Sequence, residues 1–363
     1  MGSYTLFGSQ ASLFTGKARG YLRWKGVDFT EQSVTPKIMQ DVILPTVGWP
    51  VIPVIRTEDG TILQDTADII AHMEAAEAGP SVLPEGPLQR FVSELLHTYS
   101  DQWLVVPAMH YRWNYNEEWI YSEFGRSSSP DATPEEQYEL GKQRGQMFRG
   151  FVPMLGINEN TIPGIEASYE AFLAEFSAHL DQHPYLFGAR PSLADFAFLG
   201  PLYAHLYRDP ASGEIMKRLA PKVANWTERT IAGEGGDAPL LGEDTIPDTL
   251  LPILKRAMTE HLPVLQTSLT QFTEWLAAAE AGAEVPRAFG QSDFTQGGRT
   301  GQIITASFSL FRLQAALDEY AAMTPDARTR ADALLDAIGG DALKSFKLPA
   351  RLERRNYKLH LAT

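Results

Sequence analysis

Two short stretches of the chain, residues 51–55 and 64–70, constrain its fold more than any other feature of the sequence. The first is an apolar strand with Pro53 near its entrance, where a proline is tolerated because it has no N–H to give to the ladder. The second runs from a short strand, through an Asp-Thr pair that resembles a cap, into an amphipathic helix. Residues 58–60 between them, Glu-Asp-Gly, are typical of a hairpin turn.

The chemistry of this unit suits a small peptide ligand. If the Ile52-Pro53 bond is cis, the backbone N–H and C=O of Ile52 face solvent and are free to pair with an extended peptide. Asp65 and Thr66 then open a helix, and the free amide groups of a helix N-terminus favour anionic groups. The sequence therefore predicts a site for a small peptide with a free carboxylate.

The residues before this unit complete a pattern of strands and helices. Residues 4–8 predict a first strand, residues 12–26 a helix that ends at the C-cap Gly26, and residues 29–34 a second strand. A poorly marked helix or loop begins at Pro36. The predicted order, β-α-β-(α)-β-β-α, is the thioredoxin-like arrangement of an α+β domain.

This part of the chain resembles the glutathione S-transferase family. The resemblance rests on motifs that stand in family order and at family spacing: Ser12 and Arg19 separated by six residues, Gly26 after the first helix, Ile52-Pro53, and Asp65-Thr66. Residues 185–196 match the helical-domain signature of the family. The resemblance is to a serine-type, bacterial-like member, and it implies a thioredoxin-like domain followed by an all-α C-terminal domain.

Ser12 stands just before the first helix, where the family places its catalytic Ser or Cys. The resemblance implies that its hydroxyl stabilises the thiolate of glutathione, with help from the positive end of the helix. A pKa shift of about one to two units is worth roughly 1.4–2.7 kcal/mol, which one charge-assisted hydrogen bond can supply. The alternatives are that Ser12 is only an N-cap, or that Ser9, Thr15 or Tyr4 is the catalytic hydroxyl.

Further glutathione-binding residues are implied by the same resemblance. The carboxylate of Asp65 would meet the α-ammonium group, and the hydroxyl and N–H of Thr66 would hold the γ-glutamyl carboxylate. A plain helix cap is the alternative for this pair, and both roles are compatible. Ile52 would contact the cysteinyl backbone, and Pro53 would have a structural role.

The chain departs from the family just before Ile52. Many members carry Lys or Gln there, whereas this chain has Val51. The glycyl carboxylate of glutathione then needs another cation, and Lys37 is the candidate. Without a replacement, the affinity for glutathione would be weaker.

The electrophile pocket is predicted between Ser12 and the first helix of the helical domain. Its candidate lining is mostly aromatic and consists of Phe14, Trp103, His110 and Tyr111. Bulky aromatic groups beside a few polar ones suit an apolar or aromatic electrophile, and His110 or Tyr111 is a candidate for polarising a leaving group. Ordinary helix-bundle core is an equal alternative for these side chains.

The remainder of the chain predicts helices after a Pro/Gly-rich linker. The expected domains are a thioredoxin-like glutathione-binding domain at 1–80, an all-helical substrate domain at 88–235, and a helical C-terminal extension at 236–363. Helical regions are predicted over 89–113, 249–281 and 303–323. The last part is either an extension that wraps the second domain, which we favour, or a third domain.

The net charge of −14 and the absence of cysteine narrow the function. An acidic chain repels phosphate backbones and anionic lipid, so neither nucleic acid nor a membrane is an expected partner. Disulfides, thiolate metal sites and cysteine-based thiol transfer are excluded, and no metal site is predicted because His179 and His183 lack a third ligand. With no signal-peptide pattern and no apolar run that approaches a bilayer span, a cytoplasmic protein is expected.

The resemblance thus implies a glutathione S-transferase-like enzyme, with glutathione as co-substrate, a role in detoxification and a homodimeric state. Its thiolate would attack an electrophilic carbon of a small apolar or aromatic substrate. One alternative is a non-catalytic binding or scaffold protein on the same fold. The other is a glutathione-dependent lyase, etherase or isomerase that uses the same thiolate.

Overall fold

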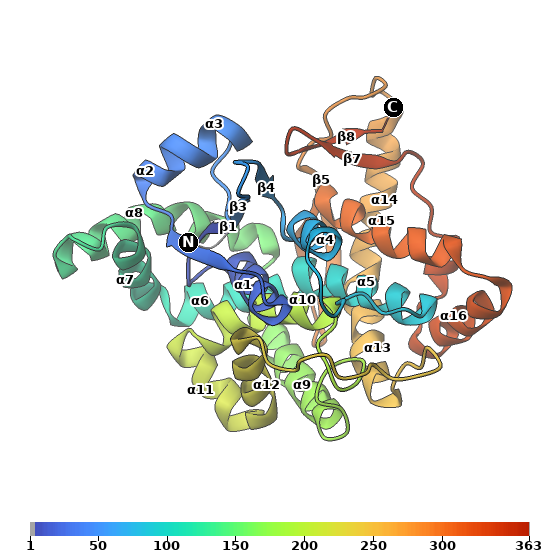
Figure 1. The fold of residues 1–363 in the computed structure, drawn as a ribbon. Coiled ribbons are helices and arrows are strands. Elements are labelled where there is room, and N and C mark those ends of the chain that lie inside the picture. The colour runs from blue at the N-terminus through green and yellow to red at the C-terminus, as the bar shows by residue number, and fades with distance from the viewer. Residues whose placement is uncertain (1–3, 363) are drawn as a thin grey trace. The chain divides into compact units, whose positions relative to one another are not determined.

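A computed structural model describes residues 4–362 of the chain (Figure 1). These residues divide into two compact units. The first unit consists of the segment that ends at Val82, together with Ala108–Val152 and Asp195–Ala238. The second consists of Leu83–Pro107, Pro153–Ala194 and the segment from Pro239 onward. Both units are assembled from three separate parts of the chain, and the domain boundaries predicted near residues 80 and 235 stay predictions.

The first unit contains a four-stranded mixed sheet in the order β2-β1-β3-β4 (Figure 1). Its strands are β1 (Tyr4–Gly8), β2 (Phe29–Ser33), β3 (Val54–Arg56) and β4 (Ile62–Gln64). Strand β1 runs parallel to β2 and antiparallel to β3, and β3 and β4 form the predicted hairpin. Helices α1 (Leu13–Lys25) and α4 (Thr66–Ala76) pack against each other. The predicted thioredoxin-like order is confirmed.

Helix α1 begins and ends as its sequence predicts. Ser12 is its N-cap, and Gly26 is its C-cap with a φ of 75°, in the left-handed region that glycine adopts without a steric penalty. On its buried face, the rings of Tyr21 and Trp24 lie 5.6 and 5.7 Å from that of Phe196. This packing fixes the orientation of the helix that carries Ser12.

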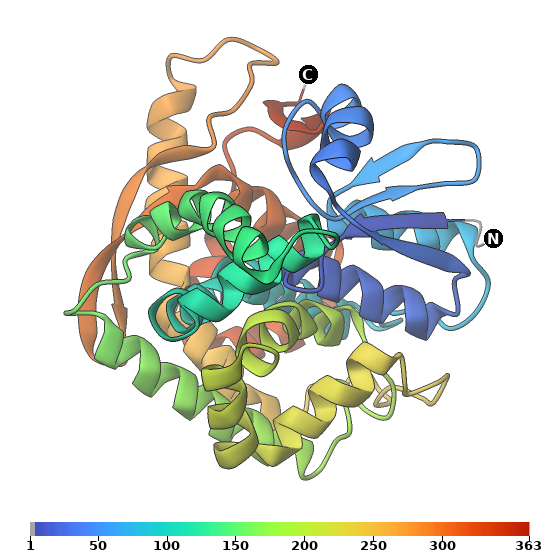
Figure 2. The same cartoon turned by 90° about the vertical axis from the view of Figure 1, so that its left-hand side faces the viewer.

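A tight helical hairpin, formed by α7 (Glu117–Ser128) and α8 (Pro134–Phe151), also belongs to the first unit (Figure 2). Gly125 and Gly141 lie where the two helices meet. A Cβ atom on either glycine would lie 1.7 Å from a backbone oxygen of the other helix, so only glycine permits this approach.

The remaining helical segments of the first unit are short and include two π-helical stretches. They are α2 (Pro36–Ile38), η1 (Met39–Ile43), α3 (Leu44–Val47), η3 (Leu202–Tyr207), α11 (Pro210–Leu219) and α12 (Pro221–Ala232). Most of α6 (Val105–Tyr115) and of α10 (Leu193–Pro201) also belongs to this unit, which takes up the chain again at Ala108 and at Asp195. Helices α12 and η3 pack against α1.

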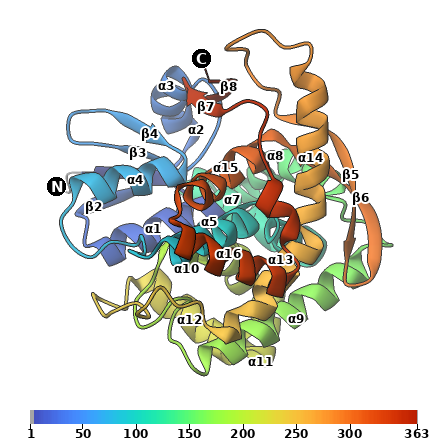
Figure 3. The ribbon, with the colours of Figure 1, turned by 90° about the vertical axis from the view of Figure 1, so that its right-hand side faces the viewer.

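The second unit is mostly helical, and α5 (Pro87–Gln102) packs along α15 (Ser307–Ala322) in its centre (Figure 3). The single long helix predicted over 89–113 is wrong, since α5 ends at Gln102 and α6 begins at Val105. The side chain of Trp103, at the break, is buried. The other helical segments of this unit are η2 (Pro153–Leu155), α9 (Ile162–Leu180), η4 (Asp248–Leu250), α13 (Leu251–Glu260), α14 (Leu262–Leu276), α16 (Pro325–Ile338) and η5 (Asp341–Ser345).

Asp244 caps the start of α5 although it lies far along the chain. Its two carboxylate oxygens accept hydrogen bonds from the N–H groups of Leu88 and Gln89 at 2.9 and 2.8 Å. A Cβ on Gly86 would lie 2.0 Å from this carboxylate, so the glycine leaves room for it. Arg330 also donates to Asp244 at 2.9 Å, and the cap therefore ties α16 to α5.

A buried carboxylate, Glu260 at the end of α13, joins α9, the residue that follows α5 and a strand of the second unit. One of its oxygens accepts from the indole N–H of Trp103 at 3.0 Å and from Gln296 at 3.3 Å. The other accepts from Ser168 at 2.6 Å and from Arg256 at 3.1 Å. The two oxygens are thus surrounded by protein donors, as a buried charge requires.

The extension also contains two β-hairpins that the sequence analysis did not predict. Strands β5 (Ala288–Gln296) and β6 (Arg299–Ala306) pair antiparallel across a turn at Gly297 and Gly298, and the hairpin packs on α14 (Figure 3). The helix predicted from Ile303 therefore begins only at Ser307. A second, shorter hairpin joins β7 (Leu352–Arg355) and β8 (Lys358–Leu361). Among residues 4–362, no helix is long and apolar enough to cross a membrane.

Candidate functional site

The predicted glutathione-binding residues of three chain segments lie at one end of the sheet. In the register of the sheet, Phe7 on β1, Val54 on β3 and Gln64 on β4 form one row. Neighbouring strands lie about 4.8 Å apart, so the row spans about 10 Å, the length of an extended tripeptide. The candidates that flank this row along the chain are Ser12, Ile52, Pro53, Asp65 and Thr66.

Ser12 is half-buried in extended backbone conformation at the start of α1. Its Oγ accepts a hydrogen bond from the N–H of Thr15 at 3.2 Å. A serine hydroxyl has one proton to donate and two lone pairs to accept with, and this cap uses one lone pair. The hydroxyl proton is not consumed by the cap, so the capping and catalytic roles of Ser12 are compatible.

The three rival hydroxyls have different surroundings. Ser9 is buried, and its Oγ accepts from the N–H of Ala11 at 3.3 Å. Thr15 is fully buried, with its Oγ1 3.4 Å from the N–H of Ser9. Tyr4 donates to Glu77 at 2.8 Å, and burial together with this carboxylate raises the pKa of Tyr4. Of these four hydroxyl residues, Ser12 combines a helix N-terminus with partial exposure.

Asp65 and Thr66 stand at the start of α4. Asp65 has a φ of 79°, which is rare for a residue with a side chain and costs about 1–3 kcal/mol in backbone strain. Its carboxylate accepts from the N–H of Ala67 at 2.8 Å, and Thr66 is buried. The Ile52-Pro53 peptide bond is cis, and Ile52 is half-buried.

Lys37, the candidate cation for the glycyl carboxylate, lies on α2 with its side chain 84% exposed. Its ammonium group pairs with Asp41, one turn further along, and this hydrogen bond raises the pKa of Lys37. An ammonium group has three N–H donors, so the pairing with Asp41 leaves donors for a second carboxylate, and the role of Lys37 in binding glutathione stays a prediction. Val51, which stands at the position where many family members have a polar side chain, is half-buried.

The four residues predicted to line the electrophile pocket differ in burial. Phe14 is half-buried on α1. His110 and Tyr111 on α6 are buried, with ring centroids 4.9 Å apart, and a ring nitrogen of His110 lies 2.8 Å from the amide nitrogen of Asn114. Trp103 belongs to the second unit and is buried. Such burial is typical of bundle core, and the pocket stays a prediction.

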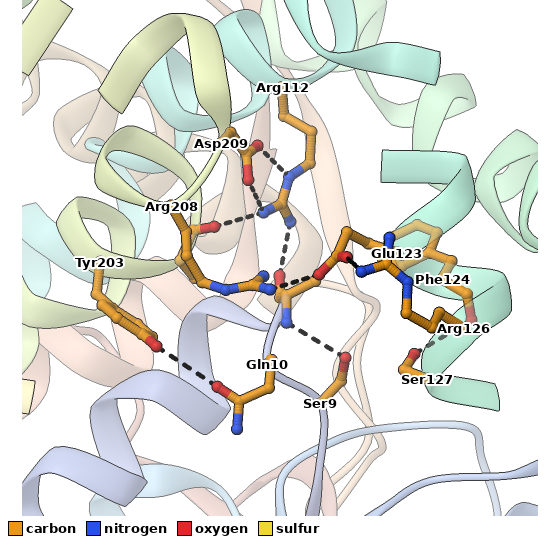
Figure 4. A network of polar contacts seen from close by, with 12 residues as sticks. Ser9, Gln10, Arg112, Glu123, Phe124, Arg126, Ser127, Tyr203, Arg208 and Asp209 are labelled. Atoms are coloured by element: carbon orange, nitrogen blue, oxygen red, sulfur yellow. Dashed lines mark hydrogen bonds and ion pairs between the residues drawn. The ribbon is translucent and has the colours of Figure 1, made fainter. Parts of the chain in front are cut away.

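Sequence reasoning missed Arg112, whose side chain is buried next to the loop that leads to Ser12. Its Nη1 donates to the carbonyl oxygen of Ala11 at 2.6 Å (Figure 4). The only signal in the sequence was that Arg112 is a charged residue within the aromatic-rich segment 111–115. Its buried partner Asp209 lies 97 residues away, so no spacing rule connects the two.

The histidine pair His179 and His183 does not form part of a metal cluster. A ring nitrogen of His179 lies 2.9 Å from the hydroxyl of Thr249, and burial lowers the pKa of His179 to about 4. No group of three or more His, Asp or Glu side chains within residues 4–362 is arranged to hold a metal ion.

Two segments of the chain match sequence models of known domains. Residues 6–81 match the glutathione S-transferase N-terminal domain, and residues 159–229 match the glutathione S-transferase C-terminal domain. The fold is therefore that of a glutathione S-transferase N-terminal domain followed by a mostly helical C-terminal domain, and these matches support this family for the chain. No curated protein matches the sequence.

Several solved structures are similar to this chain at low identity. A glutathione S-transferase from Rhodospirillum rubrum is 19% identical with a TM-score of 0.42, over 68% of this chain and 94% of that one. The β-etherase LigF from Sphingobium is 16% identical with a TM-score of 0.46, over 62% and 94%. A GST-like protein from Pseudomonas syringae is 18% identical with a TM-score of 0.45, over 85% and 98%.

Proposed function

We propose that this protein is a glutathione transferase in which Ser12 stabilises the thiolate of bound glutathione. The observation that carries the proposal is the convergence of Ser12, Ile52 and the Asp65-Thr66 pair at one end of the sheet. A site of this width suits an extended tripeptide. It provides a backbone strand for the middle of that peptide, and a carboxylate and a helix N-terminus for its γ-glutamyl end.

The role of Ser12 follows from its hydrogen bonding. The N–H of Thr15 occupies one lone pair of the hydroxyl, which orients the group and leaves its proton to donate to sulfur. A free thiol has a pKa near 8.5, and a donor at the positive end of α1 favours the thiolate. At pH 7, a lowering by one unit makes about a quarter of the bound thiol ionised, and a lowering by two units about three quarters.

Asp65 and Thr66 hold the γ-glutamyl end of glutathione in this proposal. The Asp65 carboxylate pairs with the α-ammonium group, while the hydroxyl and N–H of Thr66 bind the α-carboxylate. The strained backbone of Asp65 supports the proposal, because such strain is concentrated at ligand-binding positions. Ile52 pairs its backbone with the cysteinyl residue, which holds the thiol near Ser12.

The chemical step is nucleophilic attack by the thiolate on an electrophilic carbon of a small apolar or aromatic substrate. A carbon–sulfur bond forms as the leaving group departs with its electron pair. With an activated alkene, the thiolate adds instead and the neighbouring carbon takes a proton from solvent. The protein's own residues supply orientation and stabilisation of the anion.

Calorimetry and ultraviolet absorbance test the proposal together. We expect glutathione to bind with a dissociation constant below a millimolar, and Asp65→Ala to weaken that binding. The thiolate absorbance of bound glutathione, followed against pH, should give a lowered thiol pKa that Ser12→Ala returns towards about 8.5. Absence of binding at millimolar glutathione would leave the alternative of a binding or scaffold protein on this fold.

A further inference from the structure

The peptide group between Ala11 and Ser12 is held at both of its ends. Its carbonyl oxygen accepts from Nη1 of Arg112 at 2.6 Å. Its N–H, which belongs to Ser12, donates to the carbonyl of Ser9 at 3.1 Å. Because a peptide group is planar, two bonds on opposite ends fix the orientation of the whole group, including the Cα atom of Ser12. The φ of −89° at Ser12 then sets the direction of its side chain.

Arg112 is itself immobilised on its other side. Its Nε and Nη2 donate to the two carboxylate oxygens of Asp209 at 2.7 and 2.8 Å, and Nη2 also donates to the carbonyl of Ala204 at 2.6 Å. The side chains of Arg112 and Asp209 are 3% and 0% exposed. A planar guanidinium group makes these bonds simultaneously, whereas the compact ammonium group of lysine does not have this fork.

Burial of this ion pair is not explained by stability alone. The desolvation of two charges offsets most of their attraction in a protein interior, and an apolar pair of similar size is often as stable. What the pair does provide is one defined arrangement, with one guanidinium nitrogen directed at the residue before Ser12. A second arginine in the same network, Arg208, pairs instead with Glu123 (Figure 4).

We propose that Arg112 and Asp209 are positioning residues that fix the Ser12 hydroxyl at the sulfur of glutathione. The inference rests on the proposed function of Ser12, and neither side chain touches glutathione. Asp209 orients Arg112, and Arg112 holds the Ala11 carbonyl. When the hydrogen bond from Arg112 to Ala11 is lost, the Ala11–Ser12 peptide group can rotate. The Ser12 hydroxyl then moves away from the sulfur, and its hydrogen bond to the thiolate becomes weaker.

The test compares the thiol pKa of bound glutathione in four variants of the full chain. Arg112→Lys keeps a charge beside Asp209 but loses the fork, and Asp209→Asn keeps an acceptor but loses the charge. Arg208→Lys is the matched control, since Arg208 is an arginine of the same network whose partner is Glu123. Ser12→Ala gives the full effect of losing the hydroxyl. Ultraviolet absorbance against pH reports the pKa, and calorimetry reports glutathione affinity.

We expect Arg112→Lys to raise the thiol pKa by about one unit, a tenfold fall in the thiolate-to-thiol ratio, with less than a threefold change in affinity. Asp209→Asn should give a smaller rise, and Arg208→Lys none. If Ser12→Ala raises the pKa while neither Arg112→Lys nor Asp209→Asn does, the inference is overturned and the proposed function stands. If Ser12→Ala itself leaves the pKa unchanged, the proposed role of Ser12 fails first. If Arg112→Lys does not fold, Asp209→Asn decides.

Discussion

Ser12 in the first unit and Glu260 in the second are both polar groups at helix ends, but their surroundings differ. The protein engages one lone pair of the Ser12 hydroxyl through the N–H of Thr15 and leaves its proton to donate. Glu260 receives hydrogen bonds from Trp103, Ser168 and further protein donors on both oxygens. A group that keeps hydrogen-bonding capacity can serve a ligand, whereas a fully engaged one serves the fold.

The largest expected effect in this comparison comes from Glu260→Ala. Removing the carboxylate leaves the buried donors of Trp103 and Ser168 without their acceptor, and we expect a loss of about 3 kcal/mol in the free energy of unfolding. Urea denaturation followed by tryptophan fluorescence measures it. Glu175→Ala is the matched control, because Glu175 also pairs with Arg256 but is 24% exposed, and it should lose about 1 kcal/mol or less. Equal losses in the two variants would contradict the structural role given to Glu260.

Ser12→Ala should change the thiol pKa of bound glutathione more than it changes the stability of the protein. We expect the thiol pKa of bound glutathione to rise by about one to two units, or roughly 1.4–2.7 kcal/mol, against a stability loss of about 1 kcal/mol from the missing cap. Ser12→Thr keeps both the cap and the hydroxyl, so it should recover most of the pKa shift. The same absorbance titration and urea denaturation measure both quantities. A variant that loses stability without any change in thiol pKa would make Ser12 a cap only.

Acidification should destabilise the second unit through His261. Burial lowers the pKa of His261 to about 3, so the folded state keeps this ring neutral while the unfolded state takes up a proton below about pH 6.5. Stability is therefore complete above pH 6.5 and falls by about 1.4 kcal/mol per pH unit as the pH drops towards 3. His261→Phe keeps an aromatic ring against Trp103, 5.3 Å away, and removes the titration. Urea denaturation at pH 7.5 and 5.5 should show a smaller difference for this variant than for the wild type.

Asp65→Asn should have the smallest effect of the four. Asparagine tolerates a positive φ and keeps an oxygen for the N–H of Ala67, so the cap of α4 and the fold should be retained. Only the charge opposite the α-ammonium group of glutathione is lost. We expect a roughly fivefold weaker affinity, about 1 kcal/mol, by calorimetry. An unchanged affinity would remove Asp65 from the proposed contact with the ammonium group.

Local chemistry made the first unit predictable from sequence. The cap at Ser12, the C-cap at Gly26 and the hairpin between residues 54 and 64 depend on neighbours within a few residues, and each stands where its sequence placed it. The β5–β6 hairpin had a local signal too, since Gly297-Gly298 is a typical hairpin turn. The apolar Ile303 beyond it was assigned to a helix, although the strand alternation continues to Ala306.

Contacts between remote segments could not be predicted. Nothing in the spacing of Arg112 and Asp209 links two residues that are 97 positions apart, and the hold on Ala11 depends on both. The break between α5 and α6 had a local signal, because Pro107 has no N–H to donate to the carbonyl of Trp103. The remote part is the acceptor of the Trp103 indole N–H, Glu260, which lies 157 positions further along. Periodicity describes which face of a helix is apolar, but not which distant polar group will turn one side chain inward.

Because Asp244 caps α5, the N-terminus of this helix can be completed only after Asp244 has been synthesised. Gln89 is separated from its capping carboxylate by 155 residues. At about 5–20 residues per second, the ribosome needs roughly 8–31 s to add that stretch. Until Asp244 emerges, the N–H groups of Leu88 and Gln89 lack this acceptor, and water takes its place.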